Sequence, residues 1–265
     1  MSEVTLHLGD CAKVLAEFPG ACIDLTVTSP PYDNLRTYKG YTFDFETIAR
    51  ELYRVTKPGG VVVWVVGDAT IDGSETGTSF RQALYFKGLG FNLHDTMIYD
   101  TNKPPLTHNR YEQKFEYMFV FSNGIPKTFN PIKIKSNWGG TSHAGTFRQD
   151  ATGRQEKAHT PQLVQHEKLK GNIWHIPSGM GKGSLDDIWC HPATFPEALA
   201  RDHIISWSNP GDTVLDPFLG SGTTGKMAVL WDRNFIDIEI AEEYYAIAQR
   251  RIERAQAQPR LDWRV

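Results

Sequence analysis

Apolar residues recur along the chain in two spacings. Strand-like patterns are found at 23–28, 61–66, 93–99, 117–121, 213–215 and 234–240. Apolar positions at helical spacing predict helices over 45–55, 79–87, 196–207, 223–231 and 242–256, and the Lys-Pro-Gly-Gly sequence at 57–60 predicts a turn. Strands alternating with helices are typical of an α/β fold with a mostly parallel sheet covered by helices on both faces. In such sheets ligands bind at the carboxyl ends of the strands.

One central segment departs from this pattern. Residues 127–182 contain nine basic and three acidic residues, a net charge of +6, whereas the rest of the chain carries −9. The segment is rich in small polar residues and has no sustained period, so we expect a loop-rich insertion over 124–185 between core parts 1–123 and 186–265. Either the insertion is a solvated loop region, or it binds a polyanion through its basic and aromatic residues. The candidate residues for contacts with such a polyanion are Lys133, Lys135, Trp138, His143, Arg148, Arg154, Lys157, Lys168 and Lys170.

Composition narrows the class of protein. Apolar residues make up 40% and charged residues 22% of the 265 positions, as in ordinary globular proteins. The longest apolar run, 61–66, is too short for a membrane span, and the first residues do not resemble a signal peptide. Three cysteines with no C-x-x-C favour a reducing cytoplasm and predict neither a disulfide framework nor a metal site.

A glycine-rich loop joins the predicted strand at 213–215 to the helix that begins at 223. Its glycines satisfy G-x-G-x-x-G: Gly220, Gly222 and Gly225. Glu239 follows Gly220 by 19 residues, at the end of the next strand, and is placed to bind ribose hydroxyls. Asp216 would repel a pyrophosphate and attract an ammonium group, which favours S-adenosylmethionine over NAD. We expect Gly222→Val to abolish cofactor binding, because a side chain would fill the cofactor's space.

The sequence Ser-Pro-Pro-Tyr at 29–32 follows the first strong strand. Two prolines stiffen the backbone and remove two amide donors. Ser29 Oγ and the Pro30 carbonyl could then accept both hydrogens of an exocyclic amine, while Tyr32 stacks on a base that has left the duplex. The simpler interpretation is a proline-stiffened turn. The candidate catalytic residues are Ser29, Pro30, Pro31 and Tyr32.

Together, the Thr-Ser-Pro-Pro-Tyr motif at 28–32 and the Asp-Pro-Phe-Leu-Gly-Ser-Gly-Thr-Thr motif at 216–224 resemble those of the amino-methylating DNA methyltransferases. The order of the motifs, with the basic insertion between them, is similar to the β class of that family. The resemblance implies a Rossmann-like, S-adenosylmethionine-dependent core with a target recognition insertion. It also implies that the segment at 8–11 contacts adenine and that the segment at 191–197 lines the cofactor site. The cofactor-binding residues implied are Asp10, Cys11, Ser29, His191, Phe195, Asp216, Phe218, Gly220, Ser221, Gly222, Thr223 and Glu239.

The resemblance implies direct methyl transfer to an amine of double-stranded DNA. Serine at position 29 is the usual residue of cytosine-N4 enzymes and aspartate that of adenine-N6 enzymes, so cytosine N4 is favoured and adenine N6 stays open. A cognate restriction endonuclease and a homodimer are open as partners, and a cytoplasmic location is expected. Three alternatives remain: a nicotinamide-dependent oxidoreductase, a non-catalytic DNA-binding module, and a related methylase of RNA or of a protein glutamine.

Overall fold

A computed structural model of the chain describes residues 2–31, 43–101, 111–143, 147–149, 152, 155–157, 162–177 and 196–258. The chain forms two compact units. The larger contains Met1–Asn130 and Asn172–Val265, and the smaller is Pro131–Gly171. In the described part, no helix is both long and apolar enough to cross a membrane.

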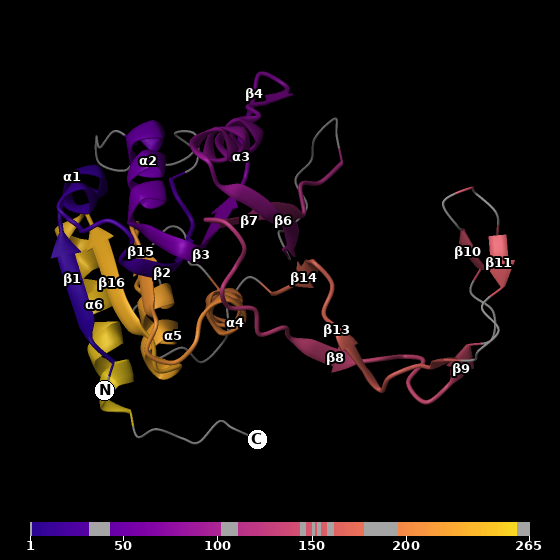
Figure 1. The fold of residues 1–265 in the computed structure, drawn as a ribbon. Coiled ribbons are helices and arrows are strands. Elements are labelled where there is room, and N and C mark those ends of the chain that lie inside the picture. The colour runs from indigo at the N-terminus through magenta and orange to yellow at the C-terminus, as the bar shows by residue number, and fades with distance from the viewer. Residues whose placement is uncertain are drawn as a thin grey trace. The chain divides into compact units, whose positions relative to one another are not determined.

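The larger unit is built on an eight-stranded sheet (Figure 1). In spatial order its strands are β1 (Val4–Leu8), β16 (Asn234–Glu239), β15 (Thr213–Asp216), β2 (Ile23–Thr28), β3 (Thr56–Val66), β7 (Phe115–Ser122), β6 (Asn92–Asp100) and β14 (Ile173–His175). The first five are parallel, β7 is antiparallel to both of its neighbours, and β14 is parallel to β6. The predicted mostly parallel sheet is confirmed.

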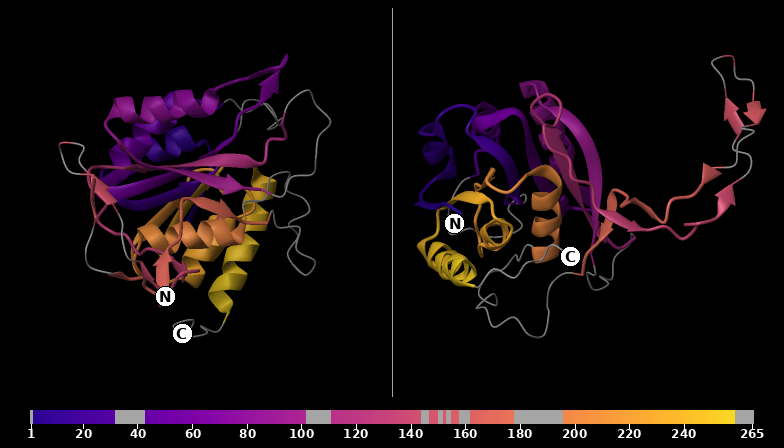
Figure 2. Two further views of the ribbon diagram at one scale, coloured as in Figure 1. Left: turned by 90° about the vertical axis from the view of Figure 1, so that its right-hand side faces the viewer. Right: turned by 60° about the horizontal axis from the view of Figure 1, so that its bottom comes forward.

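Helices cover both faces of this sheet, as predicted (Figure 2). One face carries α1 (Cys11–Ala16), α2 (Phe45–Val55) and α3 (Thr78–Leu89), and the other carries α4 (Glu197–Trp207), α5 (Thr223–Leu230) and α6 (Glu242–Ala257). Leu52 of α2, Phe86 of α3 and Trp64 of β3 are fully buried in one apolar cluster. Burial of these apolar faces is what holds the helices on the sheet. A small hairpin of β4 (Thr70–Ile71) and β5 (Ser74–Glu75) precedes α3.

Three details differ from the sequence prediction. The short elements β1 and α1 were not predicted, because five and six residues are too few to show a clear period. The predicted turn at 57–60 is wrong, since these residues lie inside β3. There the register between β2 and β3 shifts at Ile23/Leu25, and Gly59 takes a left-handed φ of 79°. A bulge thus accommodates the Pro-Gly-Gly sequence at the start of the strand.

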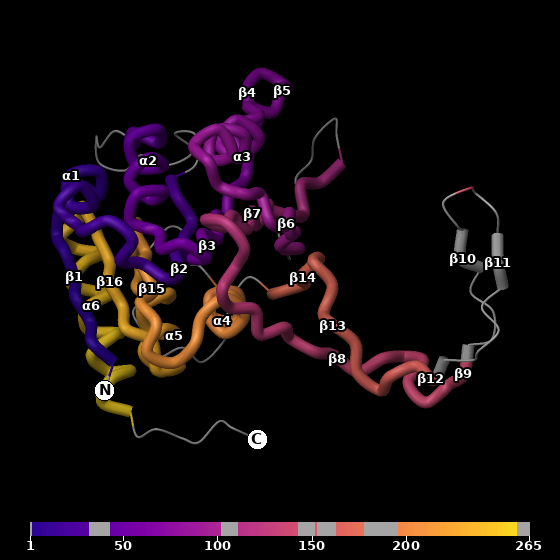
Figure 3. Tube along the Cα trace, viewed as in Figure 1, coloured from indigo at the N-terminus to yellow at the C-terminus, as the bar shows by residue number. Residues whose placement is uncertain are grey.

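The smaller unit is a run of antiparallel strand pairs, traced in Figure 3. The pairs are β8 (Lys133–Lys135) with β13 (Glu167–Leu169), β9 (Ser142–His143) with β12 (Gln162–Leu163), and β10 (Phe147–Gln149) with β11 (Gln155–Lys157). The smaller unit, Pro131–Gly171, spans fewer residues than the expected insertion over 124–185. The backbone N–H of Asn130 donates to the Ser206 carbonyl, 2.8 Å away, and β14 pairs with β6 in the main sheet. The flanks on both sides of Pro131–Gly171 therefore belong to the larger unit.

Candidate active site

The two motif loops leave neighbouring strands at the same edge of the sheet. Strands β2 and β15 are parallel and paired, with Leu25 opposite Val214. Thr28 Oγ1 donates a buried hydrogen bond of 2.6 Å to Asp216 Oδ1, and Thr224 Oγ1 donates to the Val27 carbonyl at 3.3 Å. The Ser-Pro-Pro-Tyr loop and the glycine loop therefore start next to each other, although Thr28 and Asp216 are 188 positions apart in the sequence.

The Ser-Pro-Pro segment is placed at this edge. Pro30 is buried, whereas Ser29 and Pro31 are half-buried. A proline has no amide to donate, so the segment presents hydroxyl and carbonyl acceptors with few competing donors. Tyr32 lies outside the described residues, so its predicted stacking role stays a prediction.

The glycine loop owes its shape to the helix behind it. Gly220 and Gly222 have left-handed φ values of 53° and 77°. A Cβ atom on Gly222 would lie 2.8 Å from Ala248 Cβ and 2.9 Å from Ala248 Cα of α6. The predicted cause of the Gly222→Val defect is therefore wrong. Helix α6, and not the cofactor, occupies the space that a side chain at 222 would need.

Glu239, at the end of β16, fastens three loops together. Its Oε2 accepts a 2.9 Å hydrogen bond from the Gly220 amide, and its Oε1 accepts one of 2.9 Å from the Ala241 amide. The Glu239 carbonyl accepts from the Gly9 amide at 2.8 Å. Each carboxylate oxygen has a second lone pair, so Glu239 can also accept from ribose hydroxyls.

Asp10 and Cys11 follow Gly9 at the beginning of α1, with Asp10 as the N-cap and Cys11 as the first residue of the helix. Asp10 Oδ1 caps α1 by accepting from the Ala12 amide at 2.9 Å, which gives this residue a structural task beside its predicted contact with adenine. Burial, reinforced by the nearby Asp10 charge, raises the pKa of the Cys11 thiol to about 12. The thiol is neutral at physiological pH and therefore is not poised as a nucleophile.

Three carboxyl groups gather where β15 and β16 end. Burial raises the pKa of Asp216 and of Glu239, and burial together with the Asp216 charge raises that of Asp237 to about 8. Asp237 is opposite Asp216 in the strand register and is fully buried. Within the described part of the chain its oxygens have no hydrogen-bond partner of ordinary geometry, and the nearby His7 amide only partly offsets the rise in its pKa. In their ionised forms these carboxylates disfavour a pyrophosphate and fit a cofactor that carries positive charge and no phosphate, which in turn favours the ionised forms.

Phe218, Ser221 and Thr223 complete the described part of the loop. Phe218 is half-buried, with its ring centroid 5.5 Å from that of Phe43 and 6.1 Å from that of Trp64, so it anchors the loop in the core. Ser221 and Thr223 are buried, and their hydroxyl oxygens lie 3.3 Å apart. His191 and Phe195 lie outside the described residues.

The predicted DNA-contacting residues belong to the smaller unit. Lys133, Lys135, Trp138 and Lys168 are exposed, whereas Lys170 is half-buried. On the β8–β13 pair, Lys133 and Lys135 share a side with Glu167, while Lys168 is on the other side. His143, Arg148 and Lys157 lie in β9, β10 and β11, and Arg154 is outside the described residues.

Sequence reasoning missed three residues of this region. The sequence analysis includes Thr28 only within the motif at 28–32 and Asp237 only within the predicted strand at 234–240, and it predicts no role for either side chain. Arg251 was read only as part of a helix, yet it lies on the buried face of α6 between Ala248 and Ile252. Each is a polar group at a position where the pattern requires an apolar one, and that conflict was the available signal.

These features are those expected of an α/β enzyme core in which a glycine loop that binds a nucleoside cofactor lies beside a loop of hydrogen-bond acceptors. A family model described as DNA methylase (N6_N4_Mtase) matches residues 23–250, and the chain belongs to this family. It is a DNA amino-methyltransferase, of the group that acts on cytosine N4 or adenine N6, and it uses S-adenosylmethionine. The oxidoreductase considered from the glycine loop is thereby set aside.

Relatives and solved structures agree with this assignment. The chain is 55% identical over 250 residues to the orphan methyltransferase M.BamHII of Bacillus amyloliquefaciens, covering 93% of this chain and 91% of that one. It is 29% identical over 264 residues to the DNA adenine methyltransferase YhdJ of Escherichia coli (strain K12), covering 95% and 83%. The structure of TTHA0409 from Thermus thermophilus, complexed with S-adenosyl-L-methionine, matches with a TM-score of 0.65 at 28% identity, covering 96% and 94%.

Proposed function

We propose that the chain methylates N4 of cytosine in double-stranded DNA, with adenine N6 as the alternative target. The observation that carries the proposal is the Thr28–Asp216 hydrogen bond, which joins the acceptor loop to the cofactor loop. Ser29 favours cytosine through the family resemblance. Because YhdJ is named an adenine methyltransferase, the alternative stays in the proposal.

The chain's own residues would act by binding and orientation. When bound, the cofactor supplies an electrophilic methyl group on its sulfonium. Ser29 Oγ and the Pro30 carbonyl accept the two amine hydrogens, which draws the nitrogen toward tetrahedral geometry and frees its lone pair. Tyr32 stacks on the flipped base. Glu239 holds ribose hydroxyls, and Asp216 adds negative charge beside the cofactor's positive groups.

The smaller unit is proposed as the target recognition region. Its exposed lysines are on both sides of the β8–β13 pair, which suits a ribbon with phosphates on either side. Trp138 is 64% exposed, and a contact of its ring with a base or sugar belongs to this proposal. M.BamHII is named an orphan methyltransferase, which favours action without a cognate endonuclease. A homodimer stays a prediction.

The test is to identify the methylated nucleoside. DNA from a host without its own methylation, in which the chain is expressed, is digested and analysed by mass spectrometry. We expect N4-methylcytosine, in a smaller amount when Ser29→Ala is expressed at the same level. N6-methyladenine alone would overturn the cytosine assignment and keep the amine chemistry, whereas 5-methylcytosine would contradict the mechanism.

A further inference from the structure

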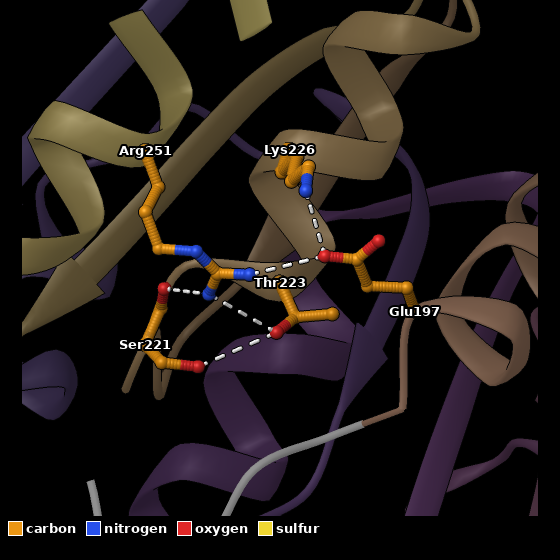
Figure 4. Close-up of polar contacts among 5 residues, drawn as sticks. All are labelled: Glu197, Ser221, Thr223, Lys226 and Arg251. Carbon is orange, nitrogen blue, oxygen red and sulfur yellow. Dashed lines mark hydrogen bonds and ion pairs between the residues drawn. The ribbon is translucent and has the colours of Figure 1, made fainter. Parts of the chain in front are cut away.

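A buried arginine reaches the cofactor loop from behind. Arg251 of α6 is 3% exposed, yet its guanidinium touches the loop at two points (Figure 4). Its Nη1 donates to the Ser221 carbonyl and, at 3.4 Å, to Thr223 Oγ1. Ser221 is in the loop between β15 and α5, and Thr223 is the first residue of α5.

The same guanidinium is tied to a third helix. Its Nη2 lies 3.2 Å from Oε1 of Glu197, the first residue of α4. Lys226 of α5 donates to the same oxygen at 2.8 Å. A buried cation needs such partners, because removing its charge from water is unfavourable unless hydrogen bonds and an opposite charge compensate. Arg251 therefore links α6, the cofactor loop and the beginning of α4.

The contact with Ser221 adds a second restraint to one peptide bond of the loop, since the Gly222 amide already donates to the Leu219 carbonyl at 2.9 Å. The Ser221 carbonyl immediately precedes Gly222, which is left-handed and pressed against Ala248 of α6. A glycine loop has many accessible conformations, and a fixed carbonyl selects one of them. The planar fork of arginine can reach the Ser221 carbonyl and Glu197 together, which a lysine ammonium cannot reproduce.

Glu197 extends the effect to a second part of the predicted cofactor site. It stands two positions after Phe195 and six after His191, both predicted to line that site. The ion pair thus ties the glycine loop to the chain segment that follows those two residues.

We propose that Arg251 is a positioning residue for the cofactor. It holds the loop around Ser221–Thr223 in the conformation that binds S-adenosylmethionine and, through Glu197, fastens that loop to the start of α4. This proposal rests on the assignment of the glycine loop to the cofactor site. Its consequence is selective: loss of Arg251 weakens cofactor binding and leaves DNA binding unchanged.

The experiment is calorimetric titration of the full chain with S-adenosylmethionine, combined with steady-state kinetics in which cofactor and DNA are varied separately. Arg251→Met should raise the Kd and the KM for the cofactor about tenfold, equivalent to about 1.4 kcal/mol of binding free energy. The KM for DNA, and kcat at saturating cofactor, should stay as in the unmodified chain. Arg251→Lys should recover part of the affinity.

Two matched controls separate positioning from general effects. Arg250→Met removes the exposed neighbour of Arg251 on the same helix, and cofactor affinity should not change. Lys226→Met removes the other cation on Glu197 without touching the loop carbonyl, so its effect should be the smaller one. The double variant Arg251→Met/Glu197→Gln should weaken binding little more than Arg251→Met alone, because the two residues act as one unit.

A lowered Tm with an unchanged Kd for the cofactor would show a purely structural role and overturn the proposal. If Arg251→Met does not fold, the proposal is tested with Glu197→Gln, because the Glu197 side chain is half-exposed. An unchanged cofactor Kd in Glu197→Gln overturns the proposal, and a raised Kd supports it. The variant Glu239→Gln separates failure of the Arg251 proposal from failure of the cofactor-site assignment. Weakened binding in Glu239→Gln but not in Arg251→Met rejects only the role of Arg251, whereas no effect in either variant rejects the glycine loop as the cofactor site.

Discussion

Removal of one hydroxyl, in Thr28→Val, tests the link between the two loops. The Thr28 hydroxyl donates at 2.6 Å to Asp216, and both residues are buried, with 0% and 5% exposure. A hydrogen bond to a charged group contributes about 1.5–3 kcal/mol. Thr28→Val should lower the free energy of unfolding by that amount, measured by urea denaturation and as a Tm lower by roughly 2–4 °C per kcal/mol.

Thr26→Val is the matched control. Thr26 precedes Thr28 by two residues on the same face of β2 and is fully buried, but its hydroxyl has no hydrogen-bond partner within the described ranges. Replacing an unpaired buried hydroxyl by a methyl group should be neutral or stabilising. Equal losses in the two variants would refute the assigned role of the Thr28 hydroxyl.

The pH dependence gives a second readout of the same change. Burial raises the pKa of Asp216, and the Thr28 hydroxyl opposes that rise. A carboxyl group whose pKa is raised by folding contributes stability below its unfolded pKa and loses it as pH rises through the folded pKa. Without the hydroxyl the pKa rises further, so the defect of Thr28→Val should be larger at pH 8 than at pH 5. A defect that grows toward low pH would contradict this reasoning.

Further expectations concern Asp237 among the buried acids and Gly222 in the glycine loop. Because the pKa of Asp237 is raised to about 8, its cost to stability should grow as pH rises from the ordinary carboxyl pKa toward 8. Asp237→Asn should flatten that decline in urea titrations, and an unchanged slope would show that Asp237 is not its source. Deprotonation of Asp237 between pH 6 and pH 9 adds negative charge where β15 and β16 end. The preference for S-adenosylmethionine, with its sulfonium, over S-adenosylhomocysteine, with a neutral thioether, should therefore increase over this range, and calorimetry with both ligands measures it. Gly222→Ala should cost about 2–5 kcal/mol, from left-handed strain and the clash with Ala248, whereas retained stability would mean that α6 moves away.

The sequence pattern predicted those parts of the fold that depend on local periodicity. Helix α2 has the predicted bounds because its apolar positions are regular and Asp44 caps it through the Thr47 amide. The start of β3 was misread because a Pro-Gly-Gly sequence usually ends an element, and only pairing with β2 shows that the strand continues through it.

The site could be predicted only as far as its motifs. The loops were assigned to strand ends, but which strands are neighbours is a tertiary fact, seen here in the Thr28–Asp216 bond. The need for glycine at 222 was predicted with the wrong cause, because Ala248 comes from a helix whose packing the pattern does not specify. Arg251 could be recognised as a charge on an apolar face, but not as the partner of a particular carbonyl.

The most direct test of the account is a single-turnover measurement of methyl transfer to DNA, with the cofactor Kd measured on the same preparations. The central claim is that the loop at 29–32 orients the amine while the glycine loop and Glu239 bind the cofactor. Ser29→Ala should therefore slow methyl transfer at unchanged cofactor Kd, and Glu239→Gln should raise that Kd. Normal single-turnover rates in Ser29→Ala, or a loss confined to its cofactor affinity, would contradict the claim.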